Sequence, residues 1–101
     1  MGIVNIMDYE DKIKYIADTY GRYNQQIKAI EECLELATAL IKSNSTRHDV
    51  ITEMADVRVM LDQLTYLLDC KDAVDKERVY KVNRQMERIG TDCSWGEPED
   101  E

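Results

Sequence analysis

Glycine and proline are scarce in this chain of 101 residues, which has four glycines and one proline. Neither residue occurs between Arg22 and Ile89. Because glycine and proline mark turns and hairpins, so long a stretch without them excludes a β-rich fold and favours helices joined by short polar links. No apolar run approaches the ~20 residues that span a bilayer, and residues 1–8 lack the basic start and apolar stretch of a signal peptide. The sequence therefore predicts an all-α protein without a membrane partner.

Positive charge and cysteine are also limited. Lysine and arginine number 13 against 21 acidic residues, which leaves a net charge of −8. Proteins bind duplexes and anionic membranes through clustered Lys and Arg, so a nucleic-acid partner is not expected either. The three cysteines, Cys33, Cys70 and Cys93, are odd in number and far apart. That spacing argues against a disulfide framework or a zinc site and favours reduced thiols in the cytoplasm.

Four amphipathic helices are predicted, because apolar residues recur at steps of three and four. Their expected ranges are 8–20, 22–42, 47–69 and 75–89, with Gly21 and Gly90 ending the first and the last. The residues expected to face inward are Ile13, Ile16 and Ala17; Ile27, Ile30, Leu34, Ala37 and Ile41; Val50, Met54, Val57, Leu61, Leu64 and Leu68; and Val79, Val82, Met86 and Ile89. We expect one four-helix domain over residues 1–90, followed by an acidic, mobile tail over residues 91–101.

Two pairs of carboxylates, three residues apart, mark the second and third predicted helices: Glu32 with Glu35, and Glu53 with Asp56. Residues three apart share a helix face, so the two pairs converge if the helices pack antiparallel. Surface acids are the alternative. Between Val50 and Leu61, however, eight of twelve residues are apolar, which favours a groove over open solvent.

In such a groove, two charges about 5 Å apart repel by roughly 3 kcal/mol at an effective dielectric of about 20. A divalent cation removes that repulsion, and ligands that are all carboxylate oxygens suit Mg²⁺ or Mn²⁺. The chain has no glycine-containing EF-hand loop for calcium. Its single histidine, His48, excludes a di-iron bundle and leaves a Ser–His or Cys–His nucleophile without support.

The same acids resemble the signature of the all-α NTP pyrophosphohydrolases, the MazG-like family. In this chain the signature consists of Glu31, Glu32, Glu35, Glu53 and Asp56. The flanking segments IEECLEL and EMADVRVMLDQL, and Tyr20-Gly21 with Gln25 before them, are similar to the family as well. The resemblance covers about residues 20–89. It implies a four-helix MazG-like bundle that forms a homodimer or a dimer of dimers. The apolar surface that the second and third helices carry beyond one stripe is expected to form the contact.

The resemblance also implies an activity: Mg²⁺-dependent cleavage of a nucleoside triphosphate between its α and β phosphates, with Mn²⁺ as a possible substitute. Glu32, Glu35, Glu53 and Asp56 would hold the metal, and Glu32 would orient or deprotonate the attacking water. Glu31 is either a supporting residue or merely exposed. A phosphoribosyl-linked nucleotide remains open as substrate, and a non-catalytic acidic helical module that binds a partner remains open as function.

Further residues are expected to bind the substrate or a second subunit. Lys81, Arg84 and Arg88 form one basic face on the last predicted helix, suited to the leaving pyrophosphate or to solvent. Gln25 is expected to bind the substrate; with Tyr20 and Tyr23 it would contact the base, unless the tyrosines simply fill the core. Apolar residues outside the main stripes are expected to meet another subunit, namely Val59, Met60 and Leu67.

Overall fold

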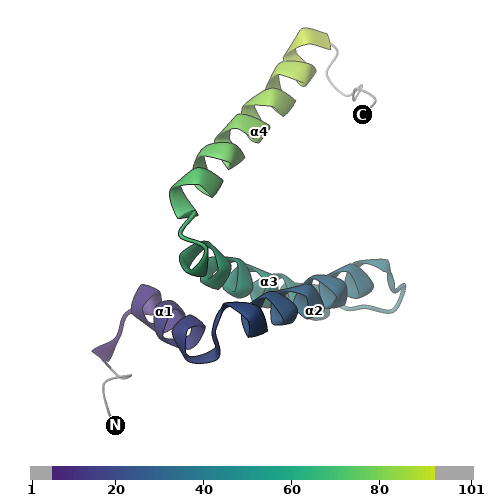
Figure 1. Cartoon of the computed structure of the whole chain (residues 1–101). Helices are drawn as coiled ribbons and strands as arrows, with labels where there is room; N and C mark the ends of the chain where they lie inside the picture. The colour runs from purple at the N-terminus through teal and green to yellow at the C-terminus, as the bar shows by residue number, and fades with distance from the viewer. Residues whose placement is uncertain (1–5, 93–101) are drawn as a thin grey trace. The chain divides into compact units, whose positions relative to one another are not determined.

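The computed structural model describes residues 6–92, with the side chains of residues 6–90, and confirms the all-α prediction. Within that range it contains no strand and four helices, α1 (Tyr9–Tyr20), α2 (Arg22–Ile41), α3 (Arg47–Leu67) and α4 (Lys71–Asp92) (Figure 1). The chain divides into two units, residues 1–69 and residues 70–101. Helices α1, α2 and α3 pack together in the first unit, and the described part of the second consists of Cys70 and α4. A single domain over residues 1–90 stays a prediction, and residues 93–101 of the expected tail lie outside the described residues.

Helix α1 begins and ends where its local sequence predicts. The Asp8 carboxylate accepts from the backbone N–H of Asp11 at 2.8 Å and so caps the first turn. Gly21 has φ 88°, a left-handed conformation that side chains disfavour, and its N–H donates to the carbonyl of Ala17 at 2.8 Å. Since α2 starts at the next residue, this glycine turns the chain between the two helices.

Helices α2 and α3 form an antiparallel pair, which holds the predicted site. Gln25 near the start of α2 donates from Nε2 to Oε1 of Gln63 near the end of α3, at 2.7 Å. A capping box opens α3: the Thr46 hydroxyl accepts from the N–H of Asp49 at 3.0 Å, and the Asp49 carboxylate accepts from the N–H of Thr46 at 2.9 Å. The Thr46 backbone N–H, which donates to the Asp49 carboxylate, and the Thr46 side chain beside it lower the pKa of Asp49. The two bonds of the box fix the direction in which α3 leaves the loop.

Removing this cap is expected to destabilise the helix pair. Thr46→Ala leaves the N–H of Asp49 without its side-chain acceptor, and the loss of an N-cap costs about 1 kcal/mol. The free energy of unfolding from urea denaturation should fall by that amount. Thr52→Ala, which changes an exposed threonine inside α3, is the matched control. An equal loss in both variants would mean that the cap itself contributes nothing.

Helix α1 is held against α3 by apolar contact and by two tyrosine–carboxylate bonds. Ile13 and Ala17 are buried. Tyr9 donates to Asp62 at 2.7 Å, and Tyr66 donates back to Asp18 at 2.8 Å. The two bonds run in opposite directions between the helices, so they fix the position of α1 along α3. Ile16, which was expected to face inward, is 38% exposed.

The buried face of α2 differs from the prediction. The residues that lie buried are Gln25, Ala29, Glu32 and Ala39. The predicted inward stripe lies on nearly the opposite side of the helix, where Ile30 is 57% and Leu34 63% exposed. The periodicity correctly locates the stripe, but within residues 6–69 no helix covers it. This apolar surface continues onto α3, where Leu61 is 49% exposed.

Met60 on α3 also departs from its expected place. It was predicted to meet a second subunit, yet it is 6% exposed and its sulfur accepts a weak bond from Gln63 at 3.8 Å. It therefore belongs to the interior of the α2–α3 pair.

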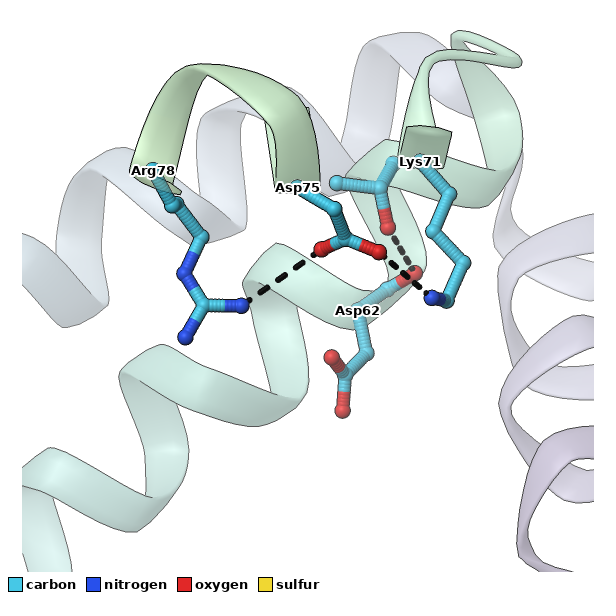
Figure 2. Close-up of polar contacts among 5 residues, drawn as sticks. Asp62, Lys71, Asp75 and Arg78 are labelled. Carbon is cyan, nitrogen blue, oxygen red and sulfur yellow. Dashed lines mark hydrogen bonds and ion pairs between the residues drawn. The ribbon is translucent and has the colours of Figure 1, made fainter. Parts of the chain in front are cut away.

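Helix α4 is longer than predicted at both ends. It begins at Lys71, soon after Asp69 adopts φ 52° and ends the preceding helix. It continues through Gly90 to Asp92, because glycine weakens a helix interior by about 1 kcal/mol without forcing an end. In its first turns the Asp75 carboxylate accepts from Lys71 at 2.8 Å and from Arg78 at 3.4 Å (Figure 2). Both cations lower the pKa of Asp75.

Candidate metal centre

Three of the four predicted metal ligands lie together. Glu32 and Glu35 are one turn apart on α2, and Glu53 reaches them from α3. One carboxylate oxygen from each residue lies within 4.8 Å of one from each of the others. The antiparallel packing that joins Gln25 to Gln63 thus also brings the two acidic motifs together. Asp56, the fourth predicted ligand, is exposed and is not part of this group.

Two oxygens in this group are buried without a hydrogen-bond partner among the residues that the structure describes: Oε1 of Glu32 and Oε1 of Glu53. A buried carboxylate oxygen that neither a donor nor water satisfies is costly, so native structures seldom keep one without a reason. A hard cation coordinated by oxygen would satisfy both atoms at once. The residues present therefore fit Mg²⁺ or Mn²⁺, and the fit rests on these two atoms as well as on the clustering.

Glu32 is buried, with 7% of its surface exposed to solvent, and this burial affects the pKa of its carboxyl group. Burial raises the pKa of the Glu32 carboxyl, and the charges of Glu35 and Asp56 raise it further. The ammonium group of Lys28, 3.4 Å from Oε2 of Glu32, acts in the opposite direction and lowers it. Asp56 therefore influences Glu32 through its charge even though it lies outside the group of ligand atoms.

This raised pKa predicts a pH dependence for the metal-free protein. The folded chain protonates Glu32 more readily than the unfolded chain does, so the free energy of unfolding falls as pH rises from 4.5 through the raised pKa. In the Glu32→Gln variant this decrease in the free energy of unfolding is expected to be absent. In EDTA, the variant should therefore gain stability relative to the wild type as pH rises from 4 to 7.

Urea denaturation at several pH values measures the effect, with Glu10→Gln on the exposed first turn of α1 as the control. A stability difference between Glu32→Gln and the wild type that stays constant with pH would contradict the burial of the charge.

Two pockets open on the same side of the α2–α3 pair, one on each side of the carboxylate group. The first has a volume of about 410 Å³ and is lined by Leu34, Glu35, Thr38, Ala39, Lys42, Ser45, Asp49 and Glu53. The second has a volume of about 700 Å³ and is lined by Tyr20, Tyr23, Asn24, Gln25, Ile27, Lys28, Glu31, Met60 and Gln63. We call them the loop-end pocket and the tyrosine pocket. Lys28, Glu31 and Glu35 on α2 and Lys42 at its C-cap follow helical steps, which places both pockets along one line.

A third hollow, of about 510 Å³, lies on the apolar side of the same pair. Its lining is Arg22, Gln26, Ala29, Ile30, Cys33, Leu34, Leu61, Leu64 and Leu68. The helix pair is thus two-sided, with the carboxylates and the two pockets beside them on one side and an apolar hollow on the other.

The other predicted site residues are distributed over both units. Gln25 is 6% exposed and lines the tyrosine pocket. Glu31 is exposed and lies 3.6 Å from Lys28. The basic residues Lys81, Arg84 and Arg88 belong to α4, where Lys81 lies 3.9 Å from Glu77. Their binding of pyrophosphate stays a prediction.

Sequence analysis missed three polar residues that line the two pockets: Lys28, Lys42 and Gln63. One available signal was the antiparallel register. Glu35 on α2 lies opposite Glu53 on α3. Gln25 is ten residues before Glu35 and Gln63 is ten residues after Glu53, so in an antiparallel pair the two glutamines also lie opposite each other. Lys28 and Lys42 share the α2 side that carries the acidic motif, but no motif singles them out.

No protein-family model, curated protein or solved structure matched the chain in the three comparisons. Among the helices of residues 6–92, none combines the length and apolar character needed to cross a membrane.

Proposed function

We propose that the chain is a Mg²⁺-dependent nucleoside triphosphate pyrophosphohydrolase, which hydrolyses its substrate to a nucleoside monophosphate and pyrophosphate. The observation that carries the proposal is the group formed by Glu32, Glu35 and Glu53, in which two buried oxygens have no partner. The sequence resemblance to the MazG-like family agrees with it and supplies the reaction.

In this proposal the three glutamates hold the cation, and Asp56 adds negative charge at its edge. The bound cation would neutralise phosphate charge, which a chain of net charge −8 otherwise repels. Glu32 orients or deprotonates the attacking water. Lys28, at 3.4 Å, holds the Glu32 side chain in place and favours its ionised form.

A second copy of the chain completes the proposal, because the apolar side of the α2–α3 pair has no cover within residues 6–69. The exposed stripe of α2 and the apolar hollow together offer the surface of a helix-to-helix interface. We therefore propose a homodimer, or a dimer of dimers, formed through α2 and α3.

The activity is tested by measuring pyrophosphate release from a panel of ribo- and deoxyribonucleoside triphosphates, with Mg²⁺ and with EDTA. The proposal expects release from at least one substrate with the metal and none in EDTA. Turnover confined to a phosphoribosyl-linked nucleotide would place the chain with that alternative substrate class. Metal binding without release from any nucleotide would favour the non-catalytic acidic module.

A further inference from the structure

The two pockets beside the carboxylates differ in chemistry. The tyrosine pocket has the aromatic rings of Tyr20 and Tyr23 at its rim, 59% and 75% exposed, and the buried amides of Gln25 and Gln63 in its lining. Aromatic rings and amides are the groups with which proteins stack on and hydrogen-bond a nucleobase. The loop-end pocket has no aromatic residue; it offers the ammonium of Lys42 and the hydroxyls of Ser45 and Thr38. Ammonium and hydroxyl groups bind phosphate. The tyrosine pocket also contains an ammonium, that of Lys28, but this group lies 3.4 Å from the Glu32 carboxylate.

We propose that a nucleotide lies along the α2–α3 groove in one direction, with its nucleoside in the tyrosine pocket and its outer phosphates beside Lys42. The inference rests on the proposed function and adds the direction of the substrate and the residues that recognise each end.

The spacing along α2 supports this direction. Gln25 and Glu32 are seven residues apart, which corresponds to about 10 Å of helix. A nucleoside bridges a comparable length between the edge of its base and its α-phosphate, so a base beside Gln25 places the α-phosphate at the carboxylate group. Lys42 lies seven residues beyond Glu35, again about 10 Å, within reach of a pyrophosphate when the lysine side chain extends.

The amide pair supplies hydrogen-bonding groups for the base. Gln25 Nε2 donates to Gln63 Oε1 at 2.7 Å, which fixes both side chains in the lining. The Nε2 of Gln63 donates only weakly, to the sulfur of Met60 at 3.8 Å. A base edge that accepts from this amide would make a better bond than the sulfur does.

The carboxylates near Lys42 are compatible with phosphate binding in the loop-end pocket. Glu35 and Glu53 belong to the carboxylate group, whose charge the cation offsets. Asp49 accepts from the backbone N–H of Thr46 at 2.9 Å, so its carboxylate serves the cap of α3.

The test is a pair of binding measurements on the two products. The full chain with saturating Mn²⁺ is titrated by calorimetry with inorganic pyrophosphate and with each of the nucleoside monophosphates. Lys42→Ala is expected to weaken pyrophosphate binding about tenfold and leave monophosphate binding unchanged, since it removes one charge-assisted bond. Tyr23→Ala is expected to weaken monophosphate binding about tenfold and leave pyrophosphate binding unchanged, since it removes a stacking surface.

The controls are Lys12→Ala and Tyr15→Ala on α1, whose side chains are exposed and line neither pocket. A double variant, Gln25→Leu with Gln63→Leu, removes both amides together, so neither is left unpaired, and should also weaken monophosphate binding alone. Because Tyr23 is exposed, its variant keeps the test valid even if the double variant fails to fold.

The outcomes separate the inference from the proposed function. Reversed effects, or equal effects on both products, would overturn the direction while leaving the enzyme in place. Binding of neither product by the Mn²⁺-loaded wild type would overturn the proposed function and the inference with it.

Discussion

Glu53→Gln is expected to reduce Mg²⁺-dependent pyrophosphate release at least about 100-fold. The substitution keeps the size of the side chain and removes the charge of the one ligand that α3 contributes to the group. A bound cation is worth several kcal/mol to a developing phosphate charge, and each 1.36 kcal/mol corresponds to a factor of ten in rate. Steady-state pyrophosphate release with the best substrate of the panel measures the loss.

The stability of the same variant distinguishes a lost ligand from a damaged fold. Glu53→Gln removes negative charge from a group of three carboxylates, so the metal-free variant should unfold at the same or a higher urea concentration than the wild type. Glu10→Gln is the control for both measurements. Wild-type turnover by Glu53→Gln would refute the assignment of Glu53, and lower stability would attribute any lost activity to misfolding.

Ile30→Glu is expected to convert the proposed oligomer into monomers. Ile30 is 57% exposed in the single chain, lies on the apolar stripe of α2 and lines the apolar hollow but neither the loop-end pocket nor the tyrosine pocket. A charge buried there in an interface without a partner costs several kcal/mol, so the dissociation constant should rise at least about 100-fold.

Sedimentation equilibrium over a range of protein concentrations measures this change. Tyr15→Glu places the same charge on an exposed position of α1 that does not line the apolar hollow, and should leave the proposed oligomer intact. A wild type that sediments as a monomer would contradict the proposed interface directly. It would mean that the stripe is covered within the chain or remains in contact with water.

Much of the local structure follows from the sequence because local physics determines it. Gly21 adopts the positive φ that a helix-ending glycine allows, and the polar run before Arg47 contains the cap that starts α3. Helical spacing places Glu32 with Glu35, and a short link makes the next helix antiparallel, so that Glu53 joins them.

The sequence could not indicate which face of α2 packs against α3. Periodicity locates an apolar stripe but does not identify what covers it, and here the face against α3 includes Gln25 and Glu32 while Ile30 and Leu34 remain exposed. The C-terminal end of α4 differs from the prediction because a single glycine, Gly90, weakens a helix without ending it. Asp56 shares a helix face with Glu53, yet its side chain is exposed, and spacing does not determine side-chain direction.

The central claim is that Glu32, Glu35 and Glu53 bind one hard cation, and direct titration of the metal-free chain with Mn²⁺, followed by electron paramagnetic resonance, tests it most directly. The account predicts saturable binding, competition by Mg²⁺, and loss of binding in Glu53→Gln but not in Glu10→Gln. A wild-type chain that leaves the Mn²⁺ spectrum unchanged, or a Glu53→Gln variant that binds as tightly as the wild type, would contradict it.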